Sequence, residues 1–156
     1  MRSIRRDLNF EPLVRQLTEV TNPATKRTVF PTMRELLCFA AALGFEKDER
    51  RELGANTAEV DARVWENLDS AVDMVYLVGV AGAQSLDVLQ PDREEELLTI
   101  FEEFANGGLL VLDGWLRTQG GDVYGDQAIL ASLRREGLLG EGPKPISNAI
   151  DDVTFS

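Results

Sequence analysis

The sequence predicts a mostly α-helical fold, a compact bundle of five or six helices. Three observations predict it: apolar residues recur at helical spacing, helix-start signals precede these segments, and glycines follow them. A length of 156 residues with 44% hydrophobic and 28% charged residues fits one globular domain with an ordinary core. We therefore expect a single helical domain over residues 5–137 and an extended tail over residues 138–156.

The first 30 residues predict one irregular helix and a linker. Residues 5–20 carry apolar side chains that can share a helical face, and Pro12 must lie near a helix start or cause a break. Residues 21–25 are rich in turn formers and predict a linker. Residues 26–30 are compatible with one short strand or hairpin, because Pro31 favours an extended residue before it.

The clearest helix in the sequence follows. Thr32 and Glu35 form a capping box, in which the hydroxyl accepts from the Glu35 amide and the carboxylate reaches back. Leucines, alanines and Phe39 then recur at helical spacing, and Gly44 is expected to end the helix. The charge-rich stretch over residues 45–56 predicts a loop.

Residues 57–83 predict a second helical block. A break is expected near residues 67–69, where Asp69 can cap a new start. Residues 72–80 are apolar on nearly all sides, which indicates a central, buried helix, although valine-rich runs also occur in strands.

The last helices are predicted around a pair of glycines. A helix begins near Pro91 with acidic residues in its first turn, and Asn106-Gly107-Gly108 is expected to stop it. A further helix is expected over residues 109–119, and the last over residues 126–136. The second glycine has two interpretations. It would let the next helix begin at once and another backbone segment approach closely, or it would contact a partner.

Charge is distributed unevenly along the chain, whose net charge is −11. Residues 1–34 hold seven bases and three acids, whereas residues 35–156 hold nine bases and 24 acids. The acidic body should repel a phosphate backbone, so general nucleic-acid binding is not expected. The basic residues near the start can contact a partner or phosphate, or form an exposed charged end: Arg2, Arg5, Arg6, Lys26 and Arg27.

Composition argues against catalysis. There is no histidine, which removes imidazole bases and histidine-containing metal sites, and the single Cys38 allows neither an internal disulfide nor a thiolate cluster. Cys38 lies in an apolar run and predicts a structural role. Glu95 and Glu102 share a helical face, but seven residues span about 10.5 Å, too far for one ion, so these acids are expected to form a solvated helix face. We expect no enzyme activity, no cofactor and no metal.

The chain shows no targeting pattern. No apolar run of signal-peptide length follows the first residues, and the longest apolar-rich stretch, residues 75–83, is about half the length of a membrane helix. With one cysteine as well, a cytoplasmic location and no membrane contact are expected.

Three stretches resemble one known family. They are residues 30–45 (FPTMRELLCFAAALGF), 94–100 (EEELLTI) and 101–109 (FEEFANGGL). Together they are similar to the small Dnd-system-associated proteins, encoded beside the DNA phosphorothioation genes in bacterial and archaeal defence islands. The resemblance covers most of residues 5–118, with phenylalanine at Phe104 where members often carry tyrosine. It brings no catalytic residues, and it implies an accessory part of phage defence that acts with DNA modification or restriction proteins.

Three hypotheses of function follow. The first is a non-catalytic accessory or regulatory subunit that binds a larger defence protein, with a second copy of the chain as another partner to consider. The second is a component that contacts nucleic acid through the N-terminal bases. The third, an enzyme using carboxylates and a divalent ion, is disfavoured by the missing histidine and motifs.

The tail is predicted to be a docking segment. Glycines and prolines prevent a regular helix in its first half. Apolar residues nevertheless recur through it, so it should pack on its own domain or on another chain. The expected contact residues are Ile146, Ile150, Val153 and Phe155.

Overall fold

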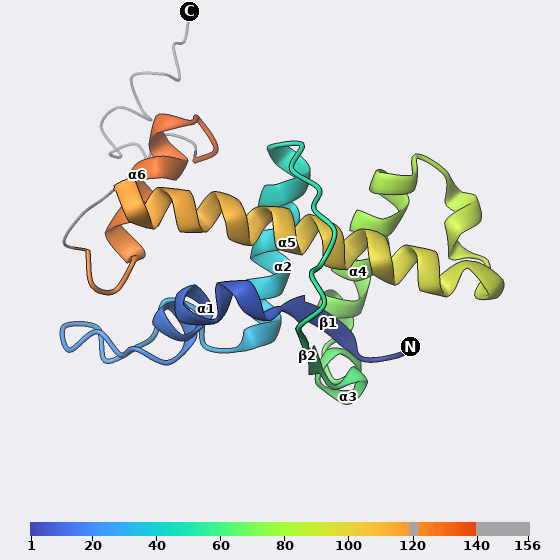
Figure 1. The fold of residues 1–156 in the computed structure, drawn as a ribbon, viewed down its shortest axis with the longest axis horizontal. Helices are drawn as coiled ribbons and strands as arrows, with labels where there is room; N and C mark the ends of the chain where they lie inside the picture. The colour runs from blue at the N-terminus through green and yellow to red at the C-terminus, as the bar shows by residue number, and fades with distance from the viewer. Residues whose placement is uncertain (119–121, 140–156) are drawn as a thin grey trace, which may run out of the picture.

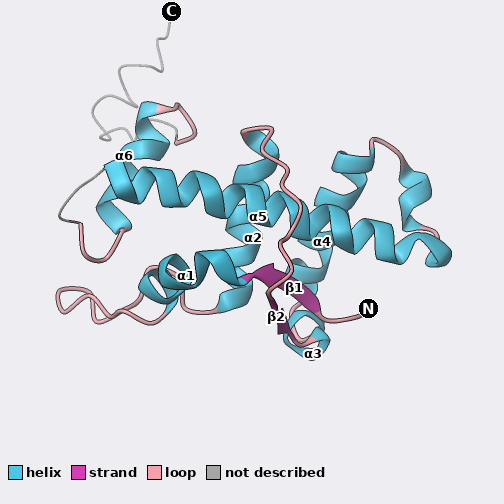
Figure 2. Cartoon of the chain, in the orientation of Figure 1, coloured by secondary structure: helices cyan, strands magenta, loops and turns pink. Residues whose placement is uncertain are grey.

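The computed structural model describes residues 1–118 and 122–139. The described residues form six helices and one small sheet, which confirms the mostly α fold (Figures 1 and 2). The helices are α1 (Glu11–Thr18), α2 (Met33–Glu46), α3 (Ala62–Glu66), α4 (Asp69–Ala83), α5 (Glu94–Thr118) and α6 (Asp126–Arg135), with short 3-10 turns η1 (Leu8–Phe10), η2 (Leu86–Leu89) and η3 (Pro91–Arg93). The strands are β1 (Ile4–Asp7) and β2 (Thr57–Val60).

Helix α5 is the axis of the molecule. Its 25 residues run along the long dimension in Figure 1, where α2 passes behind it and the 47–56 loop crosses in front. The Arg51 amide donates to the Glu103 carbonyl at 3.0 Å, and the Asn106 side chain donates to the Glu52 carbonyl at 3.1 Å. The loop is therefore fastened to α5 by hydrogen bonds, so that α5 lies between α2 and the loop that follows α2.

The predicted helix stop at residues 106–108 is wrong, because α5 continues through it. The glycines are there for packing. A Cβ atom on Gly108 would lie 1.7 Å from the Ala40 carbonyl oxygen of α2, and one on Gly107 would lie 1.8 Å from the Glu49 carbonyl oxygen of the loop. Any larger residue would push the neighbouring backbone away, so the two glycines permit the close crossing.

Helix α2 begins as expected but ends later. The Glu35 amide donates to the Thr32 hydroxyl at 3.1 Å, which confirms the N-cap. The helix continues past Gly44 to Glu46. Gly44 also serves the crossing, because a Cβ atom there would lie 2.1 Å from the Phe104 carbonyl oxygen. Glycine therefore marks contact with α5 rather than the helix end.

The sheet lies elsewhere than expected. Strands β1 and β2 pair antiparallel, from Ile4 opposite Val60 to Asp7 opposite Thr57. The expected strand near residues 26–30 is absent, and a single bridge joins Asn22 to Arg27 instead. Residues 5–7, predicted as helix, are extended because they pair with residues 57–59, at least 50 positions later in the chain. Pro12 stands in the first turn of α1, consistent with a helix start.

The block over residues 57–83 contains more elements than one broken helix. It holds β2, the short helix α3 capped by Asp61, and α4, which begins after the predicted break. The predicted cap at Asp69 is wrong, because Asp69 is the first helical residue and the N-cap Leu68 makes no side-chain hydrogen bond. The valine-rich run is helical, but it is not buried on all sides. Val75 and Val78 face the core, whereas Tyr76 and Leu77 are exposed. Helix α4 therefore carries an apolar face without cover from the described residues.

The core gathers around α5. Leu37, Leu43, Phe101 and Phe104 are buried, and Phe39 is half-buried against Phe30, with ring centroids 5.3 Å apart. Phe101 meets Trp65 edge to face at 5.5 Å. Within the described residues, no helix is both long and apolar enough to cross a membrane.

Candidate functional site

The N-terminal arginines converge on one buried carboxylate. Glu102 lies on α5 with its side chain 1% exposed. Strand β1 and the residues before it run beside α5 at this point, which brings Arg2 and Arg5 to Glu102. We call these residues, with Glu95, the Glu102 cluster.

Arg2 binds two carboxylates at once. Its guanidinium donates two hydrogen bonds to Glu102, at 2.8 and 2.9 Å, and two to Glu95, at 2.7 and 3.1 Å. The hydrogen bond with Glu102 raises the pKa of Arg2 above its ordinary value, and the hydrogen bond from Arg2 lowers the pKa of Glu95. Both groups therefore stay charged at neutral pH.

Arg5 completes the Glu102 cluster. Its backbone amide donates to Glu102, and its guanidinium lies 3.2 Å from the same carboxylate. A buried carboxylate is tolerated when charged donors surround it, since desolvation is then offset by ion pairing and hydrogen bonds. The cluster fastens the start of the chain to the central helix.

We expect Glu102→Gln to lower the free energy of unfolding by about 1–3 kcal/mol, because the amide keeps the shape but loses charged hydrogen bonds. Urea unfolding measures the change. Glu96→Gln on the same helix is the control, since Glu96 pairs with Arg93 at the surface and should change stability by less than about 0.5 kcal/mol. Equal effects of the two variants would show that the cluster adds no stability beyond a surface pair.

The other predicted basic contacts lie elsewhere. Arg6 pairs with Glu11 at the start of α1. Lys26 and Arg27 are exposed on the bridged turn over residues 22–27. The three N-terminal arginines therefore meet carboxylates of their own chain, while Lys26 and Arg27 stay exposed. Contact of any of the five with a partner or phosphate remains a prediction.

A surface pocket adjoins Arg27. It has a volume of about 330 Å³ and lies between the 20–29 segment and α6. Val29, Tyr124, Ile129 and Leu130 line it with apolar atoms. Leu130 is exposed because this side of α6 borders the pocket rather than the core. The pocket has room for an apolar group, and its charged lining residues are one base, Arg27, and one acid, Asp126.

The three glutamates in the first turn of α5 form ion pairs with positively charged groups of the same chain. Glu94 lies 3.4 Å from the amino group of Met1, Glu95 binds Arg2, and Glu96 binds Arg93. Among residues 1–118 and 122–139, no group of three or more histidine, cysteine or acidic side chains is arranged to hold a metal ion.

Cys38 is half-buried on α2. Burial raises the pKa of its thiol to about 11. The thiol is therefore protonated at neutral pH, the form that is a poor nucleophile. This agrees with a structural role for the side chain.

The predicted docking residues Ile146, Ile150, Val153 and Phe155 lie outside the described residues. The sequence did not predict the Glu102 cluster, and the expected solvated face is wrong at Glu102, whose side chain is 1% exposed because arginines enclose it. A signal for it exists: Glu102 is four residues after Leu98 and three before Ala105, so it falls within the apolar stripe of α5. A charged residue in such a stripe needs an ionic partner.

Fold and cluster together define a small, mostly α-helical protein whose basic N-terminal strand is fastened to an acidic central helix. The chain belongs to the family of DNA sulphur modification system-associated protein 4, whose model matches residues 3–139. This confirms the resemblance to Dnd-associated proteins. No curated protein and no solved structure matches the chain.

Proposed function

We propose that this chain is a non-catalytic accessory or regulatory subunit of a DNA sulphur modification system and acts by binding another protein. Family membership supports the association with such a system. Two groups considered for a functional role have structural contacts instead: Gly107 and Gly108 pack against backbone, and Glu102 is enclosed by arginines.

One observation carries the proposal of protein binding. Large apolar side chains are exposed over α4 and η2, with Leu77 65% and Leu86 71% exposed. Single exposed apolar residues are ordinary, but several on neighbouring elements are typical of interaction surfaces. The chain therefore has a surface on which a partner could bury apolar area.

Affinity capture from the native host, with mass spectrometry, tests the proposal. We expect proteins of the DNA sulphur modification system to be enriched over a capture with an unrelated acidic bait. Failure to enrich any of them from cells that express the system would count against the proposal.

Nucleic-acid contact is the competing function, and a gel shift separates the two. We expect random duplex DNA to bind more weakly than about 1 µM at about 150 mM salt, because the net charge is −11. Tighter binding that is lost in the Lys26→Ser/Arg27→Ser double variant would favour nucleic-acid contact. These two exposed positions are preferable to Arg2 and Arg5, whose replacement would also break the Glu102 cluster.

A further inference from the structure

Four exposed apolar residues lie on α4 and η2, two elements that contact each other. Tyr76 and Leu89 line one pocket of about 290 Å³, together with Pro91 and Glu94. Leu77 is adjacent to Tyr76 on α4, and Leu86 is one 3-10 turn before Leu89. We call Tyr76, Leu77, Leu86 and Leu89 the α4–η2 surface.

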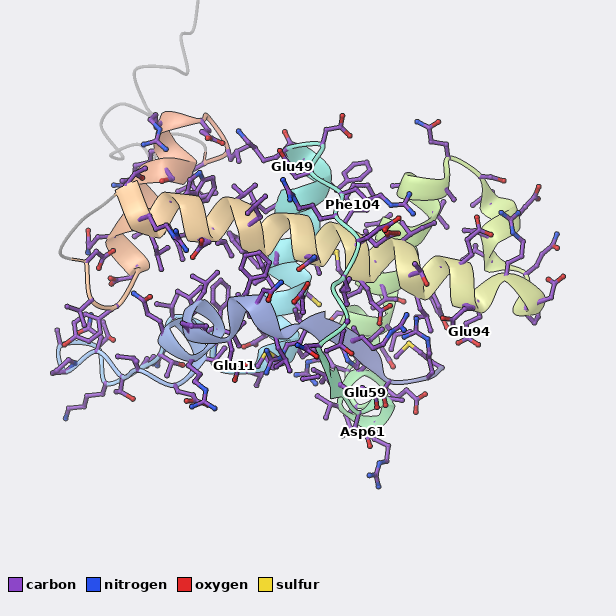
Figure 3. The ribbon with its side chains drawn as sticks, viewed as in Figure 1. Glu11, Glu49, Glu59, Asp61, Glu94 and Phe104 are labelled. Atoms are coloured by element: carbon purple, nitrogen blue, oxygen red, sulfur yellow. The ribbon has the colours of Figure 1, made fainter. Side chains whose placement is uncertain are left out.

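Carboxylates surround this surface. Residues 66–94 contain six acidic residues and one basic residue, Arg93, which pairs with Glu96. Asp73 is four residues before Leu77 and therefore shares its helix face, and Asp87 follows Leu86 directly; both are exposed. Glu94, labelled in Figure 3, lines the pocket with Tyr76 and Leu89 and also lies 3.4 Å from the Met1 amino group, so Asp73 and Asp87 are the carboxylates that a partner would meet. The α4–η2 surface is thus apolar at its centre and acidic around it.

We propose that the α4–η2 surface binds a basic, amphipathic segment of a partner protein. The inference rests on the proposed function and names the chemistry of the partner. Apolar side chains of the segment would cover Leu77 and Leu89, and its lysines or arginines would face Asp73 and Asp87. Opposite charge around an apolar centre provides specificity and speeds association, while burial of apolar area provides affinity.

Charge argues against the other occupants. A second copy using the same surface would place acidic residues against acidic residues. Nucleic acid would place phosphates there. Residues 140–156 of the chain carry three acids and one base, so they too have the wrong sign. A basic segment from a different protein fits the charge pattern best.

A fluorescent peptide of about 18 residues, with leucines at helical spacing and lysines elsewhere, is the probe. Fluorescence anisotropy measures its binding to the full-length chain. We expect saturable binding of the leucine–lysine peptide and none of a leucine–glutamate peptide of the same pattern. Equal binding of both peptides, or no saturable binding of the lysine peptide, would overturn the proposal.

Matched variants locate the binding site. We expect the Kd of the lysine peptide to rise at least about tenfold in each of two double variants, Leu77→Ser/Leu89→Ser and Asp73→Asn/Asp87→Asn, since each removes two of the proposed contacts. The controls Val123→Ser and Glu19→Gln/Glu46→Gln change exposed residues elsewhere, and their Kd for the peptide should stay within about twofold of the native value. Equal weakening by the acidic control would mean that net charge alone binds the peptide, and the proposal would be wrong. Melting temperatures verify that all variants fold.

Capture from the host separates this inference from the proposed function. If the native chain captures proteins of the modification system and Leu77→Ser/Leu89→Ser captures them equally well, the surface assignment is wrong while the proposed function stands. If the native chain captures none of them, the proposed function fails, and the peptide titration still reports whether the surface binds a basic segment.

Discussion

Replacing Gly108 with alanine should lower the free energy of unfolding by about 3 kcal/mol, although alanine favours helix by about 1 kcal/mol. The reason is the crossing of α5 with α2. A methyl group at this position would lie 1.7 Å from the Ala40 carbonyl oxygen and 2.8 Å from the Ala40 Cα atom. Backbone atoms cannot yield as a side-chain tip can, so the two helices must separate and lose packing over the whole crossing.

Gly114 supplies the matched control on the same helix. No atom lies within 4 Å of a Cβ atom built there, and the position is exposed. Gly114→Ala should therefore raise the free energy of unfolding by about 0.5–1 kcal/mol through helix propensity alone. Urea denaturation of both variants gives the comparison. Stabilisation by both substitutions would show that α2 and α5 do not cross closely at Gly108.

Gly107 and Gly108 illustrate which features of the fold can be predicted from the sequence. The capping box at Thr32, the acidic start of α5 and the apolar stripe of α5 are local patterns, and each predicts its element. A pair of glycines has two meanings, a helix end or a close crossing. Which meaning applies depends on the backbone of α2 and of the 47–56 loop, and the local sequence around residues 107 and 108 does not contain it.

The Glu102 cluster shows the same limit for charged residues. The sequence indicates that Arg2 and Arg5 are basic and near the start, and that Glu102 lies on a helix. Their meeting depends on β1 pairing with β2, residues 57–60, which places the strand beside α5. β-Strand propensity is a local property, so it does not predict which of two distant segments, here about 50 residues apart, will pair. A carboxylate within an apolar stripe was the available signal, and it indicates a buried ion pair without naming the partner.

Phe101→Ala should have the largest effect, a loss of about 3–5 kcal/mol in the free energy of unfolding. Phe101 is fully buried on α5, and its ring meets Trp65 edge to face at 5.5 Å. Truncation removes the apolar contacts of the ring and leaves a cavity between α5 and α3, which rigid helices fill only in part. For a chain of this size the melting temperature should fall by roughly 10 °C.

Phe45→Ala is the control for this variant. It deletes the same atoms at a position that is 44% exposed, where the ring contacts Phe104 from one side. Its cost should be about 1 kcal/mol, because nearly half of the residue's surface is already in water. Calorimetric melting of the two variants measures both changes. A shift below one degree for Phe101→Ala, or a shift equal to that of Phe45→Ala, would contradict the placement of Phe101 in the core and with it the packing of α5 against α3.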